Sequence, residues 1–341
     1  MGRRCRCQRR EIGFFRARNS PFPCICRARV SLAFFFGSAA GIDFFLSAIA
    51  LSPPAQQRQP GNVSIAWLGI APFVLFSLFF LIIPTALLLV GAFQDASGQF
   101  TLANIAGLAK PSIVASYLLS LQVSAASALG GAILGGILAF AVVNGSLPGW
   151  IRPTLTTFSG VASNFAGVPL AFAFIATLGR VGLVTAFLNT VFGFNIYSAG
   201  FNLLNFWGLT LTYLYFQIPL MILILTPALD GLKKEWGEAS AILGASRWQH
   251  WRYITFPILW PSLLGATLLL FANAFGAVAT AYALTGASLN IAPILLYAQI
   301  RGDVLHDPNL GFALAFGMVL ITGLSNLGYI VLRARSERWL K

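Results

Sequence analysis

The chain is dominated by long apolar stretches separated by short polar segments. Stretches without any Asp, Glu, Lys, Arg or His cover 67–93, 116–143, 154–179, 203–229, 260–285 and 311–332. A bilayer core of about 30 Å takes roughly 20 apolar residues as a helix, so each stretch is long enough to cross it. The pattern predicts an all-α polytopic membrane protein with six transmembrane helices.

Composition excludes the other broad classes. Hydrophobic residues make up 57% of the 341 positions and charged residues only 9%, whereas globular proteins average about 25% charged residues. A soluble enzyme, a disordered chain and a coiled coil are therefore excluded.

Loop charges predict the orientation. With six spans, the loops 144–153, 230–259 and 333–341 lie on one side and hold nine Lys and Arg, whereas 94–115, 180–202 and 286–310 hold three. Basic loops stay in the cytoplasm, so we expect both ends of the six-span domain to be cytoplasmic (N-in/C-in). The segment 180–202 is moderately apolar but rich in Gly and Asn, and we expect an outer-surface amphipathic or re-entrant piece rather than a span.

The first 60 residues differ from the rest. They hold ten of the 22 Lys and Arg and all four cysteines, Cys5, Cys7, Cys24 and Cys26. One residue between paired cysteines fits a zinc site poorly, and a basic excess at one end does not indicate a nucleic-acid partner. The apolar stretch 30–51 allows a signal-like leader, an interfacial anchor, or upstream sequence from a mis-assigned start. We favour the last, with residues 61–341 forming the six-span domain.

The polar loop 232–257 between the fourth and fifth spans has the pattern of two short helices and a turn. Glu235 and Glu238 complement the N-terminal end of a helix dipole. Ala239, Ile242 and Leu243 recur at helical spacing, which gives one apolar face, and Gly244 is placed to end the helix. We interpret the first helix as a surface that a partner grips, and the alternative is a helix resting on lipid headgroups.

This loop resembles the signature loop of permease subunits of binding-protein-dependent ABC importers, the type I, MetI-like family. The family pattern is Glu-Ala-Ala, three residues, Gly, nine residues, Ile-x-Leu-Pro. The positions that match it are Glu238, Ala239, Ser240 for Ala, Gly244, Ile254, Phe256 for Leu, and Pro257. The resemblance extends over roughly 64–341.

The resemblance implies a MetI-like bundle in the bacterial inner membrane, with Glu238–Gly244 as a coupling helix that docks on an ATPase subunit. It also implies its partners: two ABC ATPase subunits, a second permease chain (the same or related), and an extracytoplasmic substrate-binding protein.

The chain itself lacks the parts of an enzyme. It has no Gly-Lys-Ser or Gly-Lys-Thr sequence to cradle a triphosphate, so ATP hydrolysis is expected on a separate chain. We find no catalytic residues and expect no cofactor or bound metal. The alternative function is a stand-alone secondary carrier or channel, although such carriers usually keep ionisable residues within their spans.

Three carboxamides deep in apolar spans, Asn164, Gln217 and Asn273, are candidates to line the transport pathway. For each of them, interhelical hydrogen bonding is an equally good interpretation. The first span and outer loop, together with the run from Ser163 to Phe172, resemble the branch of the family that includes polyamine, iron and small-anion permeases. We therefore expect a polyamine-like or other small polar solute.

Overall fold

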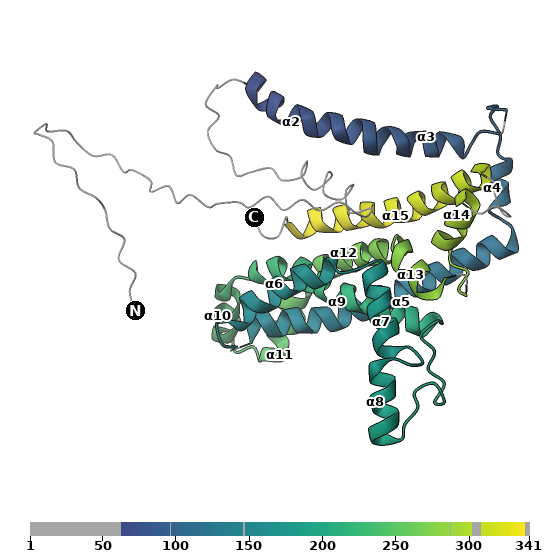
Figure 1. Cartoon of the computed structure of the whole chain (residues 1–341). Helices are drawn as coiled ribbons and strands as arrows, with labels where there is room; N and C mark the ends of the chain where they lie inside the picture. Colours follow the sequence, from purple (N-terminus) through teal and green to yellow (C-terminus); the bar gives the residue numbers. More distant parts are fainter. Residues whose placement is uncertain (1–62, 96, 146, 287, 302–307, 338–341) are drawn as a thin grey trace, which may run out of the picture. The chain divides into compact units, whose positions relative to one another are not determined.

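The computed structural model describes residues 63–341 except 96, 146, 287, 302–307 and 338–341 (Figure 1). Within these residues the chain forms helices and turns, and its only β-pairing is an isolated bridge between Gln94 and Phe100. The predictions for residues 1–60, including the zinc pairing of the cysteines, lie outside the described part.

The helices follow the chain in order. They are α2 (Val63–Ser77), the π-helix η1 (Leu78–Ile82), α3 (Ile83–Gly91), α4 (Ala103–Gly107), α5 (Pro111–Asn144), α6 (Ile151–Asn164), α7 (Val168–Leu178), α8 (Leu183–Phe192), α9 (Phe206–Asp230), α10 (Lys234–Ile242), α11 (Arg247–His250), the π-helix η2 (Trp251–Thr255), α12 (Phe256–Phe275), α13 (Val278–Thr285), α14 (Ala292–Arg301) and α15 (Pro308–Glu337).

Six helical stretches are long and apolar enough to cross a membrane. They are Gly69–Gly91, Pro111–Asn144, Val168–Phe192, Phe206–Asp230, Arg247–Phe275 and Asn309–Arg335. The predicted class, an all-α polytopic protein with six membrane-capable helices, is confirmed.

The bundle is centred on α5 and α9, which pack along each other; α12 packs on both and on α15, and α3 covers α15. Small residues bring α5 and α9 close. A Cβ atom added to Gly131 would lie 2.7 Å from Cβ of Gln217, and one added to Gly135 would lie 2.7 Å from the carbonyl oxygen of Ile218. Small residues allow such close helix contacts in lipid.

The third predicted span, 154–179, differs from the structure. Its residues form α6 and α7, separated by a break at 165–167. Figure 1 shows α6 lying alongside α9, whereas α7 and α8 follow one another in a different direction. Residues 180–202 were expected to contain no spanning helix, but α8 extends α7 into the membrane-capable stretch Val168–Phe192. The sequence pattern missed this because Gly179 and Gly182 interrupt the apolar run.

The fifth predicted span, 260–285, is also broken. The helix α12 ends at Phe275, and α13 begins at Val278 after the residues Gly276 and Ala277. Both breaks fall inside apolar runs, where hydrophobicity gives no sign of them. Broken helices occur at membrane depth only where protein or a water-filled cavity surrounds the backbone.

The buried side chains form separate clusters along α5 and α9. One cluster, which we call the near core, lies toward the loop 232–257 and includes Met221, Leu225, Leu259, Ala266 and Leu270. The other, the far core, joins α9 to α7, α13 and α14 and includes Leu170, Leu209, Phe216, Ala281 and Leu284. The helices that follow the two breaks, α7 and α13, therefore meet in the far core.

Candidate functional site: the loop between α9 and α12

The helix α10 presents apolar side chains to its surroundings instead of burying them. Ile242 and Leu243, at its C-terminal end, are both 86% exposed, and Ala239 and Glu238 are also exposed. Adjacent exposed aliphatic side chains on a polar loop are typical of a surface that contacts a protein partner or a membrane. The face predicted from the spacing of Ala239, Ile242 and Leu243 is thus exposed as a unit.

The turn after α10 has the hydrogen bonds of a Schellman motif. The N–H of Gly244 donates to the carbonyl oxygen of Ala241 (3.0 Å), and the N–H of Ala245 donates to that of Ser240 (3.0 Å). Gly244 has φ +77°, the left-handed conformation that favours glycine at this position. The predicted role of Gly244 as the residue that ends the helix is confirmed by this geometry.

The second short helix begins with its own cap. The side chain of Ser246 accepts from the N–H of Gln249 (3.2 Å), and the N–H of Ser246 donates to the Gln249 side chain (2.8 Å), which is a capping box. From α11 the chain continues through η2 into α12 without an intervening loop. The turn, α11 and the start of the fifth span are therefore one continuous piece of ordered backbone.

A side-chain contact ties α10 to this second helix. The hydroxyl of Ser240 donates to the carbonyl oxygen of Gly237 (2.8 Å), and its oxygen lies 2.9 Å from Nδ1 of His250. Since the hydroxyl has only one proton, Nδ1 of His250 is the donor in the second bond. This role of His250 could not be predicted from the sequence, because the pairing depends on the fold of the turn.

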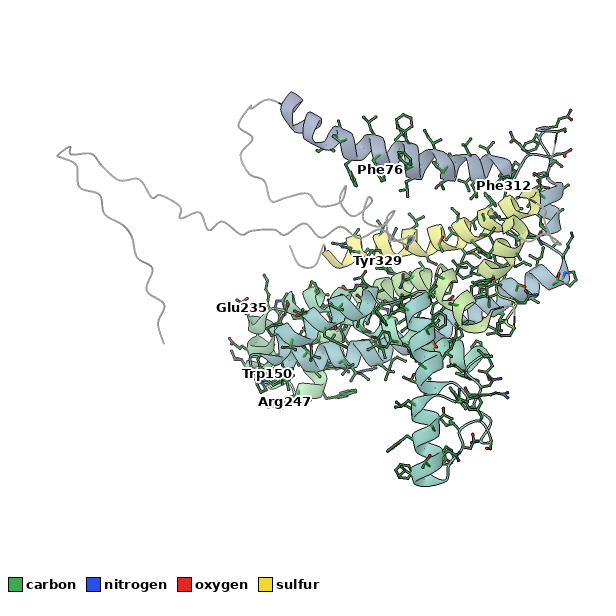
Figure 2. All side chains as sticks on the ribbon, in the orientation of Figure 1. Phe76, Trp150, Glu235, Arg247, Phe312 and Tyr329 are labelled. Atoms are coloured by element: carbon green, nitrogen blue, oxygen red, sulfur yellow. The ribbon has the colours of Figure 1, made fainter. Side chains whose placement is uncertain are left out.

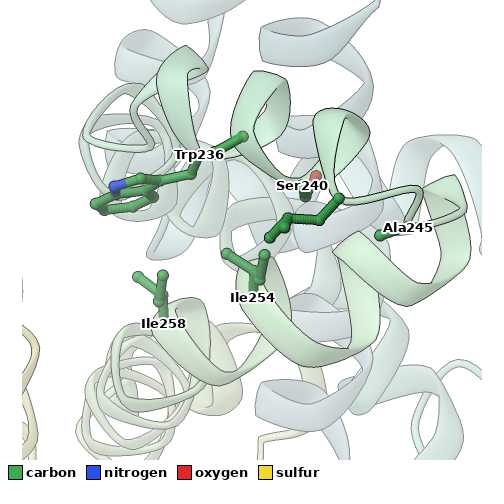
Figure 3. A pocket seen from close by; sticks show the side chains of 7 residues that line it. Trp236, Ser240, Ala245, Ile254 and Ile258 are labelled. Carbon is green, nitrogen blue, oxygen red and sulfur yellow. The ribbon is translucent and has the colours of Figure 1, made fainter.

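An apolar pocket of about 380 Å³ lies between α10 and the start of the fifth span. Its lining residues are Trp236, Ala239, Ser240, Leu243, Ala245, Ile254 and Ile258. Figure 3 shows Ile254 and Ile258 pointing toward Trp236 and Ser240 across the pocket. The motif residues Ser240 and Ile254 thus lie on opposite walls, whereas Pro257 is exposed in the first turn of α12.

Charged and aromatic side chains gather at the same end of the bundle, which we call the coupling end. Figure 2 shows Trp150, Glu235 and Arg247 at this end. Arg152, at the start of α6, forms an ion pair with Asp230, at the end of α9 (2.5 Å). Both side chains are more than 40% exposed, so the pair contributes about 1 kcal/mol or less to stability.

The predicted pathway residues are not brought together into one visible site. Gln217 is 0% exposed, and its side-chain N–H donates to the carbonyl oxygen of Leu270 (2.9 Å). Asn164 is exposed at the end of α6, where its side-chain N–H donates to the carbonyl oxygen of Gly160 (2.8 Å). Asn273 is partly buried in α12. The geometry of Gln217 is that of an interhelical hydrogen bond.

No group of three or more His, Cys, Asp and Glu side chains that could hold a metal ion occurs in the described part of the chain. Among the described carboxylates, Asp95 lies in a loop and Asp230 at the end of α9. Glu235 and Glu238 lie in α10, within the loop between α9 and α12.

Comparison with known proteins places the chain among transport proteins. Residues 131–341 match the family described as binding-protein-dependent transport system inner membrane component. A putative ferric transport system permease protein of Haemophilus influenzae is 30% identical over 171 residues, covering 47% of this chain and 26% of the relative. The sulfate transport system permease protein of Escherichia coli is 26% identical over 211 residues, covering 61% of this chain and 71% of that protein.

A molybdenum transport system permease protein of Mycobacterium tuberculosis is 25% identical over 224 residues, covering 64% of this chain and 79% of the relative. The chain thus spans about a quarter of the ferric relative but most of the molybdenum one.

The fold also resembles that of a chain in the crystal structure of a bacterial ABC transporter involved in the import of the acidic polysaccharide alginate. The TM-score is 0.59 and the sequence identity 16%, and the match covers 89% of this chain and 98% of that one. Because the family match covers more than half of its length, this chain belongs to the family of binding-protein-dependent transport system inner membrane components, as a multi-pass protein of the bacterial inner membrane.

Proposed function

We propose that this chain is the permease subunit of an ATP-driven importer and that α10 is the helix through which an ATPase subunit acts on it. The observation that carries this proposal is the exposure of Ile242 and Leu243 at the end of a short helix that is fixed to the fifth span. Because the backbone between α10 and the fifth span is ordered, a movement of a partner docked on Ile242 and Leu243 can be transmitted to that span. A flexible loop would deform instead.

Each residue of the loop motif has a role in this proposal. Glu238 and Ala239 belong to the exposed surface that the ATPase contacts. Gly244 makes the turn, and Ser240 fastens α10 to His250. Ile254 forms the wall behind α10, and Pro257, which has no N–H, lies where η2 passes into the regular helix α12.

The proposed assembly contains two permease chains and two ATPase subunits, with the coupling end in the cytoplasm. One chain supplies one α10, so the second α10 comes from a copy of this chain or from a related permease. An extracytoplasmic binding protein would deliver the substrate. The alginate transporter offers a parallel for this last partner, since a related crystal structure contains an alginate pentasaccharide-bound periplasmic protein.

We propose a small inorganic ion as the substrate, either an oxyanion such as sulfate or molybdate, or ferric iron. The relatives named above support these classes. Polyamines, expected from the sequence, are less well supported because none of these relatives is named for polyamine transport.

The test is uptake by cells that lack the chain and by the same cells complemented with it, using labelled sulfate, molybdate, ferric iron and spermidine in parallel. We expect complementation to restore uptake of one of the inorganic ions.

Vesicles reconstituted with the complete transporter should then take up that ion only when ATP and the binding protein are present on opposite sides. Gradient-driven uptake by the chain alone would refute the proposal in favour of a carrier or channel.

A further inference from the structure

The break in the third span is hydrogen-bonded to the helix that follows the break in the fifth span. The N–H of Gly167, at the break between α6 and α7, donates to the hydroxyl oxygen of Thr280 in α13 (2.7 Å). Thr280 is 1% exposed. A hydroxyl oxygen of one broken span thus holds the backbone of the other, although the two residues are 113 positions apart in the chain.

The conformation at Gly167 explains why an acceptor is needed there. Gly167 has φ +78° and ψ −148°, a region that only glycine occupies readily. The N–H of Gly167 is partly buried, and it donates to the hydroxyl oxygen of Thr280. Leaving a partly buried N–H unpaired costs free energy, so Thr280 stabilises this conformation.

The break in the fifth span is held from another side. The phenolic O–H of Tyr213, in α9, donates to the carbonyl oxygen of Ala277 (2.9 Å), and the N–H of Val278 donates to that of Gly276 (2.8 Å). Backbone groups at both breaks therefore find side-chain partners inside this chain, Thr280 for Gly167 and Tyr213 for Ala277.

Packing adds to the connection. The helices α7 and α13 pack on each other, and Leu170, Ala171, Ala281 and Leu284 lie in the same far core. The other halves of the two spans, α6 and α12, pack on α9, and α12 contributes Leu259, Ala266 and Leu270 to the near core. The halves that follow the two breaks, α7 and α13, thus share the far core.

We propose that Thr280 is a positioning residue that fastens the break in the third span to the break in the fifth, so that α7 and α13 move as one body when the transporter changes state. This inference rests on the transport function proposed above. A push on α10 reaches α12 directly through the ordered turn, and the bonded breaks carry the motion to α7 as well as to α13.

A cross-linking experiment tests this directly. The only cysteines are Cys5, Cys7, Cys24 and Cys26, and replacing them by Ser gives a cysteine-free background. A Cβ built on Gly167 would lie 3.9 Å from Cβ of Ala279, within the range of a disulfide. The pair Gly167→Cys and Ala279→Cys should therefore form a disulfide in membrane vesicles that contain the complete transporter.

Two controls accompany this pair. The pair Gly265→Cys and Leu332→Cys, with a Cβ separation of 3.7 Å, joins α12 to α15 and reports on the oxidation conditions. Gly167→Ala carries the same backbone strain without a thiol and shows whether that strain alone affects insertion. A separate variant, Asn164→Cys, reports the state of the transporter through its labelling rate with a water-soluble maleimide.

We expect ATP with vanadate to change the labelling of Asn164→Cys and to leave the yield of the 167–279 disulfide unchanged. If labelling changes and the disulfide yield falls several-fold, α7 and α13 separate, and the inference is overturned while the proposed function stands. If labelling does not change, ATP does not switch this chain, and the proposed function fails along with the inference.

The role of Thr280 itself is tested by isosteric replacement. Thr280→Val keeps the shape but removes the acceptor, whereas Thr280→Ser keeps the acceptor. We expect Val to lower the rate of 167–279 disulfide formation about fivefold or more, with Ser close to the parent and the 265–332 pair unaffected. Equal rates in the Val and Ser variants would refute the role of Thr280.

A second test leaves Gly167 in place and combines Thr280→Val with Asn164→Cys. This variant should lose most of the ATP-dependent change in maleimide labelling at position 164. Thr280→Ser should restore that change. Retention of the full change in the Val variant would also overturn the inference.

Discussion

Substitutions at Gly244 test the proposal that an ATPase subunit docks on α10. Three substitutions there separate the effect of backbone strain from the effect of charge. Gly244 has φ +77°, and no atom lies within 4 Å of a Cβ built on it. Ala, Asn and Asp can therefore all be accommodated without a clash. They differ in how well they tolerate the left-handed conformation and in the charge that they bring.

The magnitudes follow from these properties. Ala at a left-handed position costs about 1 kcal/mol relative to glycine, whereas Asn and Asp adopt this conformation more readily. Asp also places a negative charge at the C-terminal end of α10, where it costs about 0.3–1 kcal/mol. None of these costs approaches the stability of a folded domain, about 5–15 kcal/mol, so we expect all three variants to insert normally.

Docking of a partner adds a further free-energy cost for the Asp variant alone. If an ATPase subunit covers the tip of α10, the carboxylate of Gly244→Asp is removed from water without a partner, which costs several kcal/mol. We therefore expect ATP-driven transport by the Asp variant to fall below detection, by the Ala variant to fall about fivefold, and by the Asn variant to stay near the level of the parent chain.

The assay is uptake in vesicles, with the amount of permease in the membrane measured for each variant and with co-purification of the ATPase subunit as a second readout. Asn is the matched control for Asp, since the two have the same shape. Normal transport by the Asp variant with its ATPase bound would show that the tip of α10 is not an interface.

Further outcomes are expected elsewhere in the chain. A chain that begins near Val63 should insert and transport as the full chain does, and loss of either on deleting residues 1–60 would show that this segment belongs to the working protein. Replacing Ile242 and Leu243 together by Ala should weaken co-purification of the ATPase subunit at least tenfold, because burying each of these side chains contributes about 1.5–3 kcal/mol; unchanged binding would remove them from the interface. Gln217→Leu should leave the KM of uptake unchanged, as suits an interhelical hydrogen bond, and a several-fold rise in KM would instead place Gln217 on the pathway. Arg152→Gln should lower stability in detergent by about 1 kcal/mol or less, and a larger loss would indicate that the Asp230 ion pair is more than a surface contact.

The hydrophobic pattern predicts the class of fold well, because lipid requires long apolar helices whatever their packing. It also locates the loop 232–257, whose spacing of Glu238, Gly244 and Pro257 is a local property of the sequence. Gly244 could be assigned to a turn for the same reason, since helix ends are set by neighbouring residues.

The breaks at 165–167 and 276–277 could not be predicted in this way. They depend on contacts between residues far apart in the chain, such as Gly167 with Thr280 and Tyr213 with Ala277. A glycine or an alanine in an apolar run does not by itself distinguish a break from a continuous helix. The bond between Ser240 and His250 was missed for a similar reason, because it forms only once the turn has brought α10 and α11 together.

The close contact between α5 and α9 restricts how this protein can change over generations. At Gly131 and Gly135 even one added methyl group would collide with Gln217 or Ile218, so a larger residue on α5 is acceptable only together with a smaller one, or a shifted backbone, on α9. Such paired changes rarely arise in one step. Hybrid permeases made by exchanging segments between relatives should therefore work when α5 and α9 come from the same parent, and should fail when the exchange point separates them.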